Sequence, residues 1–205
     1  MQYPKAMLVA AAIISSTLAV PAAAQSVSLP KFTAIELTGG GGEVVLRYGP
    51  SQRVTLLTGD PRITRLEVPP VTFQRVGNST THSGGDTLVI TACGGDCPRG
   101  YQPKIEVVSP HISGIAAKSG GKVIAQGDFP SQSSLGVAAM SGAEIDVRAM
   151  AARSVGALAS SGGIVRTRPL AELGAQASAG GQIMYSGDPK TGVHVETGGL
   201  VTRAN

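Results

Sequence analysis

The sequence predicts an all-β protein whose C-terminal half is a β-solenoid, a stack of short coils that pair through their backbones. A Ser-Gly-Gly-like motif recurs in that half at intervals of 22, 20, 18 and 18 residues, a spacing close to that of solenoid coils. Apolar and polar residues alternate around each motif, as in β-strands, and helical periodicity is nearly absent. The motif occupies residues 119–121, 141–143, 161–163, 179–181 and 197–199.

The alternation separates an inner face from an outer face. One series of aligned positions is aliphatic or small throughout, and the other carries most of the charged side chains. Coils stacked about 4.8 Å apart bring like residues together, so we expect an inner aliphatic ladder and an inner hydroxyl ladder. The aliphatic ladder would contain Val123, Ile145, Val165, Ile183 and Val201, and the hydroxyl ladder Ser119, Ser141, Ser161 and Thr197.

The second residue of every motif is a glycine. Because glycine adopts a positive φ without a steric penalty, we expect these residues to form turns between strands. They are Gly120, Gly142, Gly162, Gly180 and Gly198. In four coils an apolar residue lies five or six positions after the aliphatic ladder, and we expect these residues, Phe129, Met150, Leu170 and Pro189, to fill the opposite corner.

The N-terminal half shows the same pattern less regularly. Strand-like segments at 34–38, 43–47, 53–57, 87–91 and 104–108 are separated by Gly, Pro, Asp and Asn. We expect a single solenoid domain over residues 25–205. Within it, residues 25–110 would form irregular coils or a cap, and residues 111–205 the regular coils. A cap is needed because an open solenoid end exposes unpaired backbone.

The first 24 residues have the features of a secretory signal peptide. Lys5 supplies a positive charge, residues 6–20 form an apolar run, and Pro-Ala-Ala-Ala at 21–24 gives a cleavage site. The run is shorter than the roughly 20 apolar residues that a membrane span needs. The sequence therefore predicts an exported bacterial protein, periplasmic or extracellular, with no membrane span after cleavage.

Cys93 and Cys97 are the two cysteines of the chain. In an oxidising compartment we expect them to form a disulfide that pins a short loop. Two thiols with no neighbouring His do not complete a tetrahedral metal site, and their spacing differs from that of a Cys-x-x-Cys redox pair.

Composition and motifs argue against nucleic-acid binding and against catalysis. The net charge is only +4, and aromatic residues make up 3% of the chain. Ser79, His82 and Asp86 include the residue types of a catalytic triad, but their polar turn offers no shielding for an imidazole and no oxyanion hole. His111 and His194 have no ligand partner at a usable spacing. We expect no catalytic, cofactor-binding or metal-binding residues.

An enzymatic alternative stays open. Some β-solenoids cleave polysaccharides with acids on their outer face, and two carboxylates must flank the scissile bond. This alternative requires the outward acids to converge in one groove, whereas an ion pair between Asp146 and Arg166 of the next coil would be purely structural. The candidate acids are Asp128, Glu144, Asp146 and Asp188.

The order of the coils also carries a family resemblance. Residues 183–189 (Ile-Met-Tyr-Ser-Gly-Asp-Pro) and 195–201 (Val-Glu-Thr-Gly-Gly-Leu-Val) follow the repeats, and 32–37, 86–90 and 105–110 precede them. In these segments the sequence resembles the putative auto-transporter adhesin family, head GIN domain, over nearly all of the chain after residue 24. The resemblance implies a right-handed parallel β-helix and an adhesin role, and it implies no catalytic residues.

Together these features predict an envelope or surface protein with an adhesin-like binding or structural role. A surface glycan or another envelope component is the expected partner. Self-association is a third expectation, because the open strand edge at residues 193–201 could pair with another chain.

Overall fold

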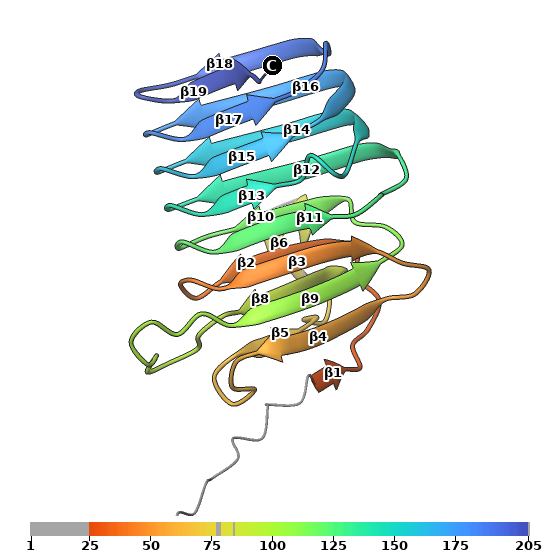
Figure 1. Ribbon diagram of the computed structural model, residues 1–205, viewed down its shortest axis with the longest axis vertical. Helices are drawn as coiled ribbons and strands as arrows, with labels where there is room; N and C mark the ends of the chain where they lie inside the picture. Colours follow the sequence, from red (N-terminus) through yellow and green to blue (C-terminus); the bar gives the residue numbers. More distant parts are fainter. Residues whose placement is uncertain (1–24, 77–78, 84, 205) are drawn as a thin grey trace, which may run out of the picture.

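The computed structural model describes residues 25–76, 79–83 and 85–204, with the side chains of 26–71 and 85–204. The predicted signal peptide lies outside these residues. The described strands form two large, mostly parallel sheets that face each other as a β-solenoid, together with a separate hairpin (Figure 1). Sheet A has nine strands and sheet B has eight.

Each coil contributes one strand to sheet B and the next strand to sheet A. Parallel pairing then joins every strand to its counterparts in the neighbouring coils. The coils are β2 (Ala34–Thr38) with β3 (Glu43–Tyr48), β8 (Thr87–Thr91) with β9 (Lys104–Ser109), β10 (Gly114–Ala117) with β11 (Lys122–Gln126), β12 (Gln132–Met140) with β13 (Glu144–Asp146), β14 (Ala152–Ser160) with β15 (Ile164–Thr167), β16 (Pro169–Ser178) with β17 (Gln182–Tyr185), and β18 (Lys190–Val195) with β19 (Leu200–Arg203).

The order of the coils in space differs from their order in the sequence. The coil β8–β9 lies on the N-terminal side of β2–β3, and β10–β11 lies on the other side of it. The chain therefore passes the level of β2–β3 between β9 and β10. Ser113 fixes this passage by donating its backbone N–H to the carbonyl of Thr33 at 2.7 Å.

Antiparallel strands close the N-terminal end of the solenoid. Strand β4 (Arg53–Thr58) pairs with β9, β1 (Gln25–Val27) pairs with β4, and β5 (Arg65–Glu67) pairs with β8. Val54 and Leu56 of β4 are buried, so this layer adds its own apolar residues to the core. The hairpin of β6 (Thr72–Val76) and β7 (Ser79–Ser83) belongs to neither large sheet.

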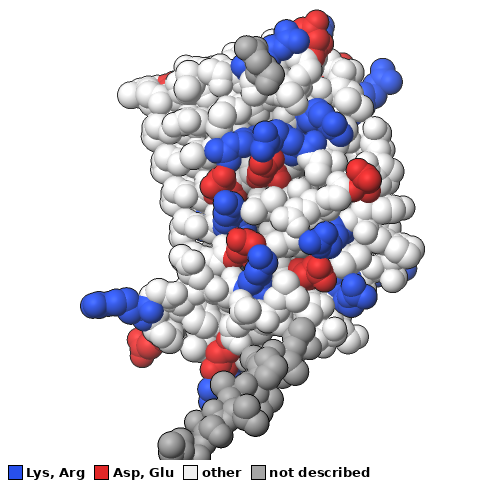
Figure 2. Space-filling model, viewed as in Figure 1, with Lys and Arg blue, Asp and Glu red and all other residues white. Residues whose placement is uncertain are grey.

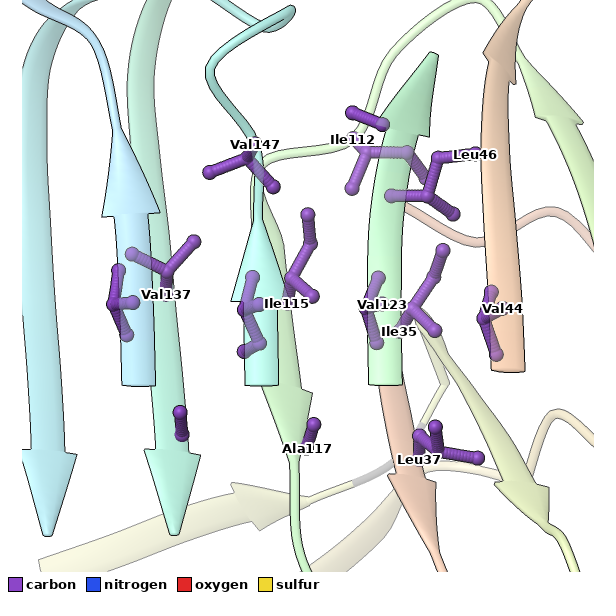
Figure 3. Close-up of a cluster of buried hydrophobic side chains, with 14 of the residues drawn as sticks. Ile35, Leu37, Val44, Leu46, Ile112, Ile115, Ala117, Val123, Val137 and Val147 are labelled. Atoms are coloured by element: carbon purple, nitrogen blue, oxygen red, sulfur yellow. The ribbon is translucent and has the colours of Figure 1, made fainter. Parts of the chain in front are cut away.

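The interior is a set of aliphatic columns, with the inward residues of the two sheets facing one another (Figure 3). The predicted aliphatic ladder is confirmed for Val123, Ile145, Val165 and Ile183, which are fully buried, and Val201 in the last coil is partly exposed. Two N-terminal residues, Val44 and Ile105, extend this ladder in register.

The predicted inner hydroxyl ladder is wrong. In the first four motifs the first residue has a positive φ, as does the glycine after it, so the pair forms a turn of type I′. At one such turn Gly163 donates its N–H to the carbonyl of Ser160 at 2.9 Å. The turn directs the hydroxyls outward, because the first residue sits at the corner and not in a strand. Ser119, Ser141, Ser161 and Thr197 are all exposed.

The third residue of the motif faces inward where two coils approach closely. A Cβ on Gly163 would lie 2.1 Å from the carbonyl oxygen of Ala139 in the preceding coil. The equivalent residue one coil earlier is Ala143, which is fully buried, so that level accommodates a methyl group.

The opposite corner is filled less uniformly than expected. Met150 is fully buried, and Phe129 packs against the core with its ring 6.3 Å from that of Tyr48. The prediction is wrong for Leu170, whose side chain is 52% exposed. Leu170 is the second residue of strand β16, so the chain has already passed the corner and this side chain lies on the outer face.

Candidate binding surface

A trough crosses the outer face of sheet B along the axis of the solenoid. Strands β8, β2, β10, β12, β14 and β16 form its floor, so at about 4.8 Å per strand it is roughly 24 Å long. It holds about 690 Å³, within the range of ligand sites. Its floor is a row of small residues in register: Ala34, Gly114, Gly136, Gly156 and Gly174, which Gly192 continues in β18.

At most of these positions neither a positive φ nor a lack of space for a Cβ requires glycine. Gly136, Gly156 and Gly174 are absent from the residues with a positive φ. A Cβ on Gly156 or Gly174 would meet no atom within 4 Å, and one on Gly136 only a carbonyl oxygen at 3.8 Å. Glycine within a strand weakens it and often marks a close approach of a ligand or another backbone. The row therefore keeps the sheet face free of side chains at a cost in stability.

Short or uncharged side chains border the row on the motif side. Ala116, Ala138, Leu158 and Gln176 follow one another in register there. At the N-terminal end of the trough Glu36 is held by Lys118, whose Nζ lies 2.6 Å from the carboxylate.

Polar side chains border the row on its other side, two residues before the glycines. Ser154 and Glu172 are neighbours in register, and the Ser154 hydroxyl donates to the Glu172 carboxylate at 3.2 Å. Lys190 continues this row in β18. The trough thus has an apolar floor and at least one polar rim.

The outer face of sheet A is chemically different, because charged side chains alternate along it (Figure 2). Lys104 and Glu43 pair at 2.7 Å across two coils, and Glu144 contacts both Lys122 at 3.8 Å and Arg166. These contacts are partly exposed, so each contributes little to stability. Together these ion pairs neutralise charge on the outer face of sheet A.

The outward acids of the enzymatic alternative take part in such ion pairs. Arg166 contacts Glu144 and not Asp146 as predicted, since Asp146 instead binds Arg148 at 2.5 Å. Asp188 is 91% exposed and lies 3.2 Å from Arg203. None of Asp128, Glu144, Asp146 and Asp188 is among the described residues that line the trough.

The pKa of Asp146 lies below its ordinary value of 3.8. Partial burial raises it, but hydrogen bonds from the side chain and the backbone N–H of Arg148 outweigh burial and lower it. A general acid needs the opposite shift, so Asp146 is poorly suited to protonate a leaving group.

Neither His111 nor His194 lines the described trough. The side chains of Ser79 and His82 lie outside the described ones, and Asp86 accepts a hydrogen bond from the Thr33 hydroxyl at 3.4 Å. His194 is exposed and contacts Glu196 at 2.9 Å. Among the described residues, no group of three or more His, Cys, Asp or Glu side chains could hold a metal ion.

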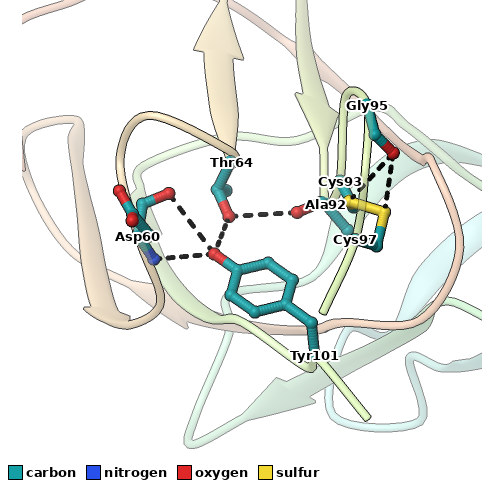
Figure 4. Close-up of a disulfide and its surroundings, with 7 residues drawn as sticks. All are labelled: Asp60, Thr64, Ala92, Cys93, Gly95, Cys97 and Tyr101. Carbon is teal, nitrogen blue, oxygen red and sulfur yellow. Dashed lines mark hydrogen bonds between the residues drawn. A yellow bond between two sulfur atoms is a disulfide. The ribbon is translucent and has the colours of Figure 1, made fainter. Parts of the chain in front are cut away.

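The disulfide lies at the N-terminal end, in the connection from β8 to β9 (Figure 4). Cys93 and Cys97 are bonded there, with their Cα atoms 6.0 Å apart. In the same connection the Tyr101 hydroxyl lies 2.7 Å from the Thr64 hydroxyl and accepts the Asp60 N–H at 2.7 Å. The loop therefore joins the coil β8–β9 to the antiparallel cap.

The sequence interpretation overlooked the glycine row of the trough. Its members from Gly114 to Gly192 each stand five residues before a motif, so they repeat at the same intervals as the turns. The outward positions were interpreted only as a polar face, so this row of glycines was not predicted to be a binding feature.

Comparisons with known proteins give structural likenesses. The solved structure of a putative adhesin from Bacteroides fragilis NCTC 9343 is similar, with a TM-score of 0.48 and 14% identity over 90% of this chain and 99% of that one. A putative lipid binding protein from Parabacteroides distasonis ATCC 8503 has a TM-score of 0.38 and 15% identity over 89% and 96% of the two chains. A putative cell adhesion protein from Clostridium sporogenes ATCC 15579 has a TM-score of 0.33 and 8% identity over 88% and 97%.

No family model matches the sequence, and no curated protein does. All three TM-scores are below 0.5. Among the described residues, none forms a helix long and apolar enough to cross a membrane.

Proposed function

We propose that this chain is an exported, adhesin-like binding protein of the bacterial envelope that holds an extended glycan chain in the trough of sheet B. The proposal depends on the row of glycines in the trough. At Gly156 and Gly174 a Cβ would meet no atom within 4 Å, and neither residue has the positive φ that favours glycine. Because the fold does not need glycine there, a requirement outside the fold is the simplest reason for keeping it. Export rests on the predicted signal peptide of residues 1–24.

The repeat of the trough favours a polymer as its ligand. Each coil presents nearly the same floor about 4.8 Å after the previous one, so a chain of like units meets like contacts at every step. An extended peptide advances only about 3.1–3.4 Å per residue, so its residues would not stay in register with coils about 4.8 Å apart. Sugar rings are larger than an amino-acid residue and come closer to the spacing.

The chemistry of the trough suits sugars held by their apolar faces and rim hydroxyls. Gly156, Ala138 and Leu158 offer an apolar floor to C–H groups, while Gln176 and Ser154 offer hydrogen bonds at the edges. No aromatic ring lines the described trough, so stacking contributes nothing and each sugar is held weakly. Affinity would come from many equivalent contacts along one chain.

The enzymatic alternative has less support. Among the described residues, Glu36 is the single carboxylate that lines the trough, and Lys118 neutralises it, while Glu172 on the rim accepts a hydrogen bond from the Ser154 hydroxyl. Glycoside hydrolysis ordinarily requires two carboxylates. We therefore propose binding without cleavage.

A panel of linear bacterial and host polysaccharides, immobilised as an array, tests the proposal with the mature chain. The matched variants are the double substitution Gly156→Leu with Gly174→Leu, which fills the trough, and Gln182→Leu on sheet A, an exposed residue of the opposite face. The trough variant should lose at least about tenfold in affinity while Gln182→Leu binds normally.

Two results would contradict the proposal. Failure of the mature chain to bind any polysaccharide would remove the glycan role. Binding that survives in the trough variant, with a native circular dichroism spectrum, would place the site elsewhere. Release of reducing sugar ends from a bound polysaccharide would instead support the enzymatic alternative.

A further inference from the structure

The last coil leaves its inner face open at the C-terminal end of the solenoid. Val193 and Val195 of β18 face inward, in register with Ala175 and Ala177 of β16. Those alanines are 4% and 0% exposed, whereas each valine is 48% exposed. All six residues of β18 are exposed.

Two inward columns stay apolar at this end, although their last residues, Val193 and Val195, are half exposed. One inward column is alanine at every level from β10 to β16 and changes to the larger Val195 at the last level. Terminal coils of solenoids normally turn polar so that the open end is soluble. Here Val193 and Val195 keep two inward columns apolar, while Thr191 and Arg203 stand where Leu173 and Tyr185 stand one coil earlier.

The N-terminal end shows how this fold covers its interior. Antiparallel strands close each sheet there, β4 and then β1 beyond β9 in sheet A, and β5 beyond β8 in sheet B. At the C-terminal end, β18 and β19 pair only with β16 and β17 among the described strands. Their outer edges offer free backbone donors and acceptors.

We propose that the C-terminal end pairs with the same end of a second copy of this chain. A two-fold axis perpendicular to both sheets would set β18 antiparallel to β18 of the second copy, and β19 antiparallel to its counterpart, in a single step. Such an interface closes on itself. Stacking head to tail is disfavoured because the N-terminal edges are the three-residue strands β1 and β5, and short edge strands resist pairing.

The charges at the ends of β18 are complementary in this arrangement. With the axis at Val193, residue 190 of one copy stands opposite residue 196 of the other. Lys190 then faces Glu196 of the second copy, and the pair forms twice. Both residues lie on the outer face of the sheet, as alternate positions along one strand do. The inward Val193 residues of the two copies meet at the axis and become covered.

Sedimentation velocity of the mature chain, from about 1 µM to about 1 mM, tests the pairing. We expect a monomer–dimer equilibrium and no larger species. Lys190→Glu or Glu196→Lys alone would set like charges opposite each other at two places, so each should raise the dimer Kd by about tenfold. Lys31→Glu, an exposed lysine near the other end of the solenoid, is the matched control and should leave the Kd unchanged.

The combination of Lys190→Glu with Glu196→Lys restores opposite charges and should restore the dimer. This rescue separates pairing from any loss of folding, which circular dichroism monitors in each variant. A chain that stays monomeric throughout the concentration range would overturn the proposal. So would a dimer that neither single charge reversal weakens.

Discussion

The hydroxyl of Tyr101 lies 2.7 Å from the hydroxyl of Thr64, and Thr64 in turn donates to the carbonyl of Ala92 at 3.0 Å. This chain of hydrogen bonds connects the loop after β8 with the segment between β4 and β5. It joins the antiparallel cap to the first coil in space. Stability of the capped end should therefore depend on a few polar atoms.

Tyr101→Phe should lower the free energy of unfolding by about 1 kcal/mol, because Thr64 and the Asp60 N–H lose their partner in a partly buried site. Urea denaturation measures the change. Tyr48→Phe is the control, since Tyr48 is 47% exposed, and it should cost less than Tyr101→Phe. Equal effects of the two substitutions would contradict the role given to Tyr101.

The double substitution Cys93→Ser with Cys97→Ser should destabilise the chain by about 2 kcal/mol, the chain-entropy value for a disulfide that closes so short a loop. Reduction of the unaltered protein should have the same effect. Thermal unfolding with and without reductant gives the comparison. If the reductant also lowers the melting temperature of the double variant, the effect does not come from the disulfide.

The two rows of glycines should respond oppositely to alanine. Gly162→Ala should cost about 1–2 kcal/mol, because residue 162 has a φ of 75°. Gly156→Ala should be neutral or stabilise by up to about 1 kcal/mol, because its Cβ would meet open space in an ordinary strand conformation. Chemical denaturation of the two variants measures both changes in the free energy of unfolding. A marked loss of stability in Gly156→Ala would mean that the trough glycines serve the fold.

Thr167→Val should stabilise the chain by about 1 kcal/mol. Thr167 is fully buried in the core, and its hydroxyl has no hydrogen-bond partner among the described residues. Valine has nearly the same shape, and Val147, directly after β13, stands at the corresponding position one coil earlier. Ser109→Ala is the contrasting variant. Its buried hydroxyl donates to the carbonyl of His111 at 2.9 Å, so its removal should destabilise the protein.

Asp146 should make the stability depend on pH below about 4. Its pKa in the folded chain is lower than its ordinary value of 3.8, so the folded state favours the ionised form. The stabilisation is complete above the unfolded pKa and is lost as the pH falls through the folded pKa. Asp146→Asn should therefore be less stable than the unaltered chain at pH 7, and the difference should shrink towards pH 2. A difference that is constant over this range would contradict the shift.

The sequence allowed the solenoid, its repeat period and most of its inner residues to be predicted, because the alternation of side chains is local and the motifs recur. It predicted the hydroxyl ladder wrongly, since alternation was continued through residues such as Ser161 that in fact form a turn. The pairing of Asp146 was also predicted wrongly. Register gives the neighbour in the next coil, but the long side chain of Arg148 reaches the carboxylate from its own coil.

Two other features depend on contacts between distant residues. The antiparallel cap is set by pairings such as that of Val54 with Val107, for which a local pattern gives no signal. The trough follows from the outward positions of sheet B, which a search for buried faces passes over. Gly156 shows both points, because its repeat is visible in the sequence but its open surroundings are visible only in the fold.

The coil β2–β3 lies between two coils that come later in the sequence, β8–β9 and β10–β11, and this order affects folding. Ala34 pairs with Thr87 across more than fifty residues, whereas each later coil pairs with a neighbour about twenty residues away. The first coil made during synthesis must therefore wait for two later ones before it is enclosed, which should make the N-terminal block the slow step of folding. The later coils carry no such constraint. Over evolutionary time, whole repeats can be gained or lost after β11 and the trough lengthened or shortened with them, while residues 25–126 must be inherited as one unit.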